Sequence, residues 1–202
     1  MITKKILLTM GLLMAAMSNG HAANINKNYI KSLVSPGKFV IVIEYYNNNN
    51  NASKRVGYTS NSPFNADGPG KIAINKSADI NLYGLHPCKG DLVNIKEGYS
   101  GSCDDYAVDQ LKTILKSAPV IYCLAFVSEE NSKTKDATCY AYTYFPGSMD
   151  SVDMIEEQLV SIGAMELDRN KDGRPIRPDL AKAENIGRKG KYGLWQDPRF
   201  QK

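Results

Sequence analysis

The chain contains few side chains suited to nucleophilic or acid–base catalysis. His86 carries an imidazole of the kind that serves as a general base, but a lone histidine without a paired nucleophile is more typical of a loop residue. No serine stands in a Gly-x-Ser-x-Gly setting. Asp104 and Asp105 lie where a helix is expected to begin, and the helix dipole alone explains two carboxylates there. These residue types therefore do not support an acyl-transfer enzyme.

One acidic motif has the spacing of a calcium-binding loop. Residues 168–173 read Asp-Arg-Asn-Lys-Asp-Gly, and a carboxylate follows at the twelfth position of the motif, where a bidentate ligand would sit. The side chains that would offer oxygen are Asp168, Asn170, Asp172 and Asp179. Pro175 takes the usual apolar position, and basic residues surround the motif. An Asp-Gly turn between two helices explains the same residues, and a weak calcium site is the alternative.

The first 22 residues have the pattern of a secretory signal peptide. Lys4 and Lys5 precede an apolar run at residues 6–17, and a small-residue exit follows at 20–22. The run is shorter than the ~20 residues that a membrane-spanning helix needs. No cysteine follows the run directly, so a lipid anchor is not expected. We expect export, to the periplasm or out of the cell.

Export makes disulfide bonds the expected state of the four cysteines. Of the three possible connectivities, local geometry favours Cys88 with Cys103 and Cys123 with Cys139. The second pair lies in two strand-like runs, and folding these as a hairpin brings the sulfurs together. Zinc is the competing interpretation. It is disfavoured because no CxxC spacing is present and His86 is the only histidine after the signal.

Composition and periodicity predict one α+β domain. The chain has 202 residues, is 43% hydrophobic and 23% charged, and carries a net charge of +4, which excludes wholesale disorder, a rod and an intensely basic chain. Strands are expected at 39–43, 71–75, 79–83, 120–127 and 138–144, and helices at 104–117, 151–162 and 179–188. The Asn-rich stretch at 47–62 predicts a mobile surface loop. This order is typical of an OB-fold, a five-stranded Greek-key barrel with a helix between strands three and four.

The C-terminal end resembles the closing signature of the staphylococcal nuclease (thermonuclease-like) family. Residues 192–198 read Tyr-Gly-Leu-Trp-Gln-Asp-Pro, preceded by Ala-Glu at 183–184 and Gly-Arg at 187–188. Residues 155–163 are similar to the family's Val-Asn-Glu-x-Leu-Val-x-x-Gly helix. Asp67-Gly68 and the Leu-Tyr-Gly-Leu-His-Pro-Cys run at 82–88 stand where the family has Asp-Gly-Asp-Thr and Arg-Leu-x-Gly-Ile-Asp-x-Pro-Glu. Trp195 is expected to anchor the last helix in the core, so this motif indicates the fold and not an activity.

The resemblance implies a phosphodiesterase site, and this chain departs from it. The family site has two arginines, a glutamate and aspartate ligands for Ca²⁺, which together offset charge on the phosphate and position water. In this chain the second aspartate of the first motif falls on Pro69, the first arginine on Asn81 or Ile80, the aspartate of the second motif on Leu85 or His86, its glutamate on Cys88, and the second arginine on Ala137 or Thr138. No bidentate phosphate clamp remains.

The C-terminal fifth of the chain is its basic end. Residues 164–202 hold 10 basic and 6 acidic side chains. The basic ones that a phosphate backbone could follow are Arg169, Lys171, Arg174, Arg177, Lys182, Arg188, Lys189 and Lys191. OB barrels commonly bind single strands on such stripes, although interspersed acids favour a solvated face. Weak contact with nucleic acid is therefore one expected partnership.

These observations lead to one expectation about function. We expect residues 39–202 to form an exported, disulfide-stabilised domain, with a helical part at 148–202, that has lost phosphodiester hydrolysis and acts as a binding or scaffold module. An envelope protein is the other expected partner, and the N-terminal extension at 23–38 is a candidate docking segment. The alternative is an active calcium-dependent nuclease with relocated catalytic residues.

Overall fold

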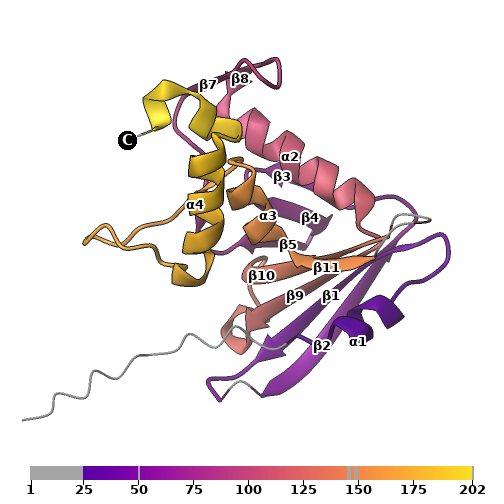
Figure 1. The fold of residues 1–202 in the computed structure, drawn as a ribbon. Helices are drawn as coiled ribbons and strands as arrows, with labels where there is room; N and C mark the ends of the chain where they lie inside the picture. Colours follow the sequence, from indigo (N-terminus) through magenta and orange to yellow (C-terminus); the bar gives the residue numbers. More distant parts are fainter. Residues whose placement is uncertain (1–24, 50, 145–146, 148–149, 202) are drawn as a thin grey trace, which may run out of the picture.

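The computed structural model describes residues 25–49, 51–144, 147 and 150–201. The predicted signal peptide lies outside these ranges. The described chain is an α+β protein with one large mixed sheet and two small ones (Figure 1). The helices are α1 (Lys27–Ser32), α2 (Cys103–Ser117), α3 (Ile155–Ser161) and α4 (Ala181–Gly190). The strands are β1 (Phe39–Tyr46), β2 (Ala52–Ser60), β3 (Asn65–Gly68), β4 (Lys71–Asn75), β5 (Ala78–Leu82), β6 (Leu85–His86), β7 (Asp91–Asn94), β8 (Tyr99–Ser102), β9 (Val120–Phe126), β10 (Thr134–Thr143), β11 (Ser151–Met154) and β12 (Glu166–Leu167).

The large sheet follows the order β2-β1-β9-β10-β5-β4-β3, with β11 also paired to β10. The pairs β1–β9 and β5–β10 are parallel, and the other neighbours are antiparallel. The two edge strands, β2 and β3, are consecutive in the chain and are joined by residues 61–64. No closed barrel is detected among the described strands, and the large sheet is mixed, with β2 and β3 at its two ends. β2, which was not expected, forms an antiparallel hairpin with β1, and β1 pairs with β9 in parallel.

The predicted loop at 47–62 is wrong over most of its length, because β2 occupies Ala52–Ser60. Val56 and Tyr58 pack against the main core from this strand, and the alternate residues Arg55, Gly57 and Thr59 are exposed. That alternation suits a half-buried edge strand. The Asn run contributes only the turn, where the Asn47 side-chain oxygen accepts main-chain N–H groups of Asn49 and Asn51.

The helix at 104–117 is confirmed as α2, with Ser102 as its N-cap accepting the N–H of Asp105. The helix predicted at 151–162 is only partly correct. Ser151–Met154 forms β11, and α3 begins at Ile155. Local periodicity fits either structure, but pairing with β10 satisfies main-chain groups that a helix would leave unpaired on that strand. The third helix, α4, follows a short 3₁₀ turn at Pro178–Leu180.

Trp195 joins α3, α4 and the C-terminal turn in the core. Its side chain is 1% exposed, and the guanidinium of Arg188 stacks on its ring at 3.8 Å from the centroid. The turn approaches the end of α3 closely enough for Leu194 N–H to donate to the Gly163 carbonyl at 2.8 Å. A Cβ on Gly163 would lie 2.2 Å from a main-chain oxygen, and its φ of +69° also requires glycine. The Gly-Leu-Trp segment therefore packs the C-terminal turn against α3 and α4.

Both predicted disulfides are present. Cys88 bonds Cys103, and Cys123 bonds Cys139. The second bond joins directly opposed residues of the antiparallel β9–β10 pair. No helix among the described residues is long and apolar enough to cross a membrane.

The N-terminal extension packs on its own domain. Ile30 of α1 is buried in a second apolar cluster on the sheet face opposite the main core. Tyr122, Tyr140 and Tyr142 also belong to this cluster, so the tyrosines of β10 are packing residues. Residues 25–33 therefore cover part of their own sheet.

Replacing Trp195 with Ala is expected to lower the free energy of unfolding by about 3–5 kcal/mol, because it leaves a cavity between α3, α4 and the sheet. Urea denaturation of the oxidised protein measures this loss. The control is Ile186→Ala on the outer face of α4, where the side chain is 46% exposed and a change within about 0.5 kcal/mol is expected. Equal losses from the two substitutions would contradict the assigned packing.

Non-reducing peptide mapping of the purified protein is expected to recover two linked peptide pairs, Cys88 with Cys103 and Cys123 with Cys139. The reason is that each pair is already adjacent in the fold. A free thiol at any of the four positions, or a crossed linkage, would contradict the register of the β9–β10 hairpin.

Candidate functional site

The positions that correspond by resemblance to catalytic residues are occupied by structural contacts. Asn81 on β5 lies opposite Asp136 on β10 and donates its side-chain N–H to that carboxylate at 2.7 Å. Pro69 lies in the turn between β3 and β4, next to Gly70, whose φ is +66°. Neither side chain offers a positive charge to a phosphate or a carboxylate to a metal ion.

Two further positions are also committed to the fold. Cys88 is buried and bonded to Cys103 at the start of α2. Thr138 on β10 accepts a hydrogen bond at 3.1 Å from Arg177. The guanidinium therefore lies where the resemblance implies the second arginine, but it comes from a distant part of the chain.

Arg177 and Glu156 form a buried ionic group where β10 changes partners. On the edge of β10 away from β9, β5 pairs with residues up to Ala137, and β11 pairs from Tyr140 onward. The close Cα–Cα distance of 4.1 Å between Cys123 and Cys139 is that of a non-hydrogen-bonded antiparallel pair. The N–H of Cys139 therefore points toward the gap between β5 and β11. Both carboxylate oxygens of Glu156 accept it, at 3.2 Å each.

The Arg177 guanidinium completes this arrangement. It lies 3.9 Å from the Glu156 carboxylate and donates to the Tyr83 carbonyl and to both oxygens of Asp179. Gly84, with φ of +79°, leaves room for the arginine stem, since a Cβ there would lie 2.5 Å from its Cγ. The Arg177 side chain is only 10% exposed, so it faces protein partners rather than a ligand.

The buried carboxylate has an altered acidity. Burial raises the pKa of Glu156 from its ordinary value of 4.5 to about 8, although main-chain N–H donors and Arg177 act in the opposite direction. Sequence reasoning missed both residues. Glu156 belonged to the expected wet face of a helix, and Arg177 to a basic stripe. The only local signal was Gly84, because a glycine can indicate that another part of the chain comes close to its main chain.

His86 lies between two carboxylates on the small β6–β12 sheet. Its Nδ1 is 2.8 Å from an Asp168 oxygen, and its Nε2 is 3.8 Å from a Glu166 oxygen. Burial raises the pKa of Glu166, against the opposing effect of His86. The Asp168 contact explains His86 as a cross-link between the loop after β5 and the segment that follows α3.

The four oxygen-bearing residues of the predicted calcium loop have separate partners. Asp168 contacts His86, Asp172 pairs with Arg174 at 3.1 Å, and Asp179 pairs with Arg177. The Asn170 oxygen accepts main-chain N–H groups of Asp172 and Arg174, which forms an Asp-Gly turn. No cluster of three or more His, Cys, Asp or Glu side chains suited to a metal ion occurs in the described part of the chain. The arrangement gives the calcium hypothesis no support.

The arginines of the expected basic stripe also have carboxylate partners. Arg177 is buried, and Arg169 and Arg188 both contact the buried carboxylate of Glu184. Arg174 pairs with Asp172. Lys171, Arg174, Lys182, Lys189 and Lys191 are exposed. Arg169, Arg177 and Arg188 are therefore the members that contact carboxylates buried in the fold or beside it.

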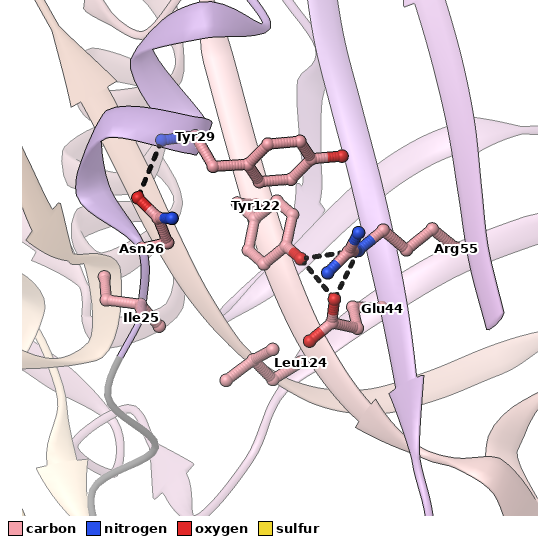
Figure 2. Close-up of a pocket in the computed structure, with 7 residues that line it drawn as sticks. All are labelled: Ile25, Asn26, Tyr29, Glu44, Arg55, Tyr122 and Leu124. Atoms are coloured by element: carbon pink, nitrogen blue, oxygen red, sulfur yellow. Dashed lines mark hydrogen bonds and ion pairs between the residues drawn. The ribbon is translucent and has the colours of Figure 1, made fainter. Parts of the chain in front are cut away.

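A pocket of about 320 Å³ lies between the start of α1 and the sheet (Figure 2). Its lining residues are Ile25, Asn26, Tyr29, Glu44, Arg55, Tyr122 and Leu124. Leu124 lies directly opposite Thr138 in the β9–β10 pair, so the pocket shares a sheet face with Thr138. The pocket has no local pattern in the sequence, because its walls come from four segments that are distant along the chain.

The polar end of the pocket is a connected group of three side chains. Arg55 Nε donates to a Glu44 carboxylate oxygen and, at 3.2 Å, to the Tyr122 hydroxyl, and that hydroxyl donates to the same Glu44 oxygen at 2.6 Å. The Arg55 guanidinium also lies 4.8 Å from the centre of the Tyr29 ring. Figure 2 shows the second Glu44 oxygen directed away from Arg55, toward the space bounded by Ile25 and Leu124.

No protein-family model matches this chain, and no curated protein matches it.

The raised pKa of Glu156 predicts a particular pH dependence of stability. The folded protein retains a proton on this group that the unfolded chain loses above pH 4.5, so Glu156 makes unfolding easier as pH rises from about 5 to about 8. In Glu156→Gln this part of the pH dependence is expected to disappear. Denaturation across that pH range measures it.

The matched control is Glu157→Gln, which removes an exposed carboxylate from the next position of α3. It should retain the pH dependence of the unmodified protein. If the two variants show the same pH profile, the assigned buried state of Glu156 is wrong.

Proposed function

We propose that this chain is an exported binding or scaffold module, similar in fold to staphylococcal nuclease, that has lost phosphodiester hydrolysis. One observation carries the proposal. Asn81, Cys88 and Thr138, which correspond by resemblance to catalytic residues, are each bonded to another group of the protein. Side chains held this way do not bind a phosphate or a metal ion.

The chemistry explains why these contacts matter. Charge grows on the phosphate oxygens during hydrolysis, and losing a single positioned donor typically costs about 10²–10³ in rate. Asn81 faces the carboxylate of Asp136, which would repel a phosphate. Cys88 provides neither a base nor a metal ligand once it is in a disulfide. The combined losses leave no working constellation at these positions.

The order of elements supports an OB-type topology as part of this proposal. The meander β3–β4–β5 precedes α2, and the hairpin β9–β10 follows it. β10 then returns to pair with β5 in parallel, which is a Greek-key feature. OB barrels are often partly open, so an open hydrogen-bonded path is compatible with this assignment. Two disulfides are compatible with an oxidising compartment.

An active calcium-dependent nuclease is the second candidate. Arg177 favours it, because its guanidinium reaches Thr138, where the resemblance implies an arginine. Its partners weigh against this role. Asp179 already balances its charge at 2.7 Å, and the side chain is nearly buried.

The mature protein, residues 23–202, is expected to show no cleavage of single-stranded DNA or RNA with millimolar Ca²⁺ or with chelator, because both arginines, the glutamate and a calcium aspartate are replaced. Gel electrophoresis of the nucleic acid, or the fluorescence of a quenched substrate, measures cleavage. Any binding of nucleic acid is expected to be weak and to decline steeply with added salt.

Calcium-dependent cleavage that is lost in Arg177→Lys would favour the second candidate. A gain-of-function variant tests the alignment itself: Pro69→Asp, Asn81→Arg and Cys88→Glu together, with Cys103→Ser to avoid a free thiol. The matched control carries only Cys88→Ser and Cys103→Ser. Cleavage by the first variant alone would support the proposed loss of an ancestral site.

A further inference from the structure

The pocket beneath α1 has the chemistry of a small-molecule site. We propose that it binds a small zwitterion, an α-amino acid with an aliphatic side chain, with its carboxylate on Arg55 and its ammonium on Glu44. This inference goes beyond the proposed function, because it does not depend on whether phosphodiester hydrolysis has been lost.

The Arg55 guanidinium is held in an orientation that suits a carboxylate ligand. Glu44 and Tyr122 hold its Nε, and the Tyr29 ring lies under its guanidinium. These contacts fix the orientation of the planar group, and the hydrogen bonds to Glu44 and Tyr122 come from Nε. The two terminal nitrogens are the donors that suit the paired oxygens of a carboxylate. The side chain is 50% exposed, so a ligand can reach it.

Glu44 is prepared for an ammonium group. One of its oxygens takes both hydrogen bonds from Arg55 and Tyr122, and the other is directed into the pocket (Figure 2). The side chain of Asn26 lies across the same space, held by its bond from the Tyr29 N–H. An ammonium donor placed there would contact the Glu44 carboxylate, whose side chain is 15% exposed.

The pair as a whole selects a ligand with both charges. Arg55 and Glu44 balance each other, so a simple anion would meet Glu44 at short range and a simple cation would meet Arg55. A zwitterion matches both groups without leaving either charge opposed. Charge complementarity therefore favours the amino-acid head group over a fatty acid or an amine.

The rest of the pocket suits a short aliphatic side chain. Ile25 and Leu124 form its apolar walls, and the ring of Tyr122 lies beside them (Figure 2). A volume of about 320 Å³ is at the small end of ligand pockets, which usually span roughly 300–1,000 Å³. That size suits one amino acid better than a long peptide or a nucleotide.

The test is calorimetric titration of the mature protein with L-leucine and with three analogues. Isocaproate lacks the ammonium, isoamylamine lacks the carboxylate, and glycine lacks the aliphatic side chain. Leucine is expected to bind. Isocaproate and isoamylamine are each expected to bind about 10-fold more weakly or worse, since a hydrogen bond to a charged group contributes about 1.5–3 kcal/mol. Glycine is expected to bind about 10-fold more weakly or worse because it buries no aliphatic side chain against Ile25 and Leu124. This comparison needs no variant and so does not depend on how substitutions affect folding.

Variants assign the binding to this pocket. Glu44→Gln and Arg55→Gln are each expected to weaken leucine binding by about 10-fold or more. Leu124→Phe should block it by filling the cavity while leaving the ion pair in place. Lys54→Gln is the matched control, because Lys54 is the neighbouring residue on β2 and its ion pair is with Glu130, outside the pocket. Circular dichroism verifies that each variant folds.

Several results would overturn the proposal. Absence of leucine binding at millimolar concentration would do so, as would isocaproate or isoamylamine binding as tightly as leucine. An equal effect of Lys54→Gln and Glu44→Gln would place any binding elsewhere. The nuclease assay is separate, so a failure of this inference is distinguishable from a failure of the proposed function.

Discussion

The main-chain N–H of Cys139 is the constraint on which much of this structure depends. It is buried on β10 at the point where β5 ends and β11 begins, so no strand accepts it. An unpaired buried N–H costs about as much as a lost hydrogen bond. Glu156 satisfies it from α3, which fixes where that helix lies on the sheet.

The use of Glu156 to accept the Cys139 N–H brings further charged groups into the interior. A buried carboxylate is costly unless it is paired, and Arg177 provides the pairing. Arg177 in turn requires Asp179, the Tyr83 carbonyl and the space left by Gly84. Four separate parts of the chain are thereby tied to the gap beside β10. The same group of contacts includes the Thr138 hydroxyl, which accepts a hydrogen bond from Arg177.

The opposite side of the sheet is organised by the N-terminal segment. Ile30 of α1 packs on the tyrosines of β9 and β10, and this packing holds Asn26 and Tyr29 beside residues of β1, β2 and β9. The pocket exists because a helix of only six residues covers part of a face whose polar end carries Glu44 and Arg55. A strand that had looked like part of a mobile Asn-rich loop supplies Arg55. A segment considered as a docking element for another protein thus completes a site on its own domain.

The sequence by itself determined those features that depend on local periodicity or on nearby residues. The helix at α2 follows from its apolar repeat and its Ser102 cap, and the disulfide between Cys123 and Cys139 follows from two apolar runs joined by a polar turn. The burial of Trp195 follows from its size and its place after a helix. Tertiary structure alone decided β2 and β11, because their residues become strands only when β1 and β10 present an edge to pair with. The tertiary structure also decided which residues form the two ionic groups, Glu156 with Arg177 and Glu44 with Arg55. Glu156 and Arg177 lie 21 positions apart, Glu44 and Arg55 come from different strands, and no local pattern records a contact that depends on where a sheet changes partners.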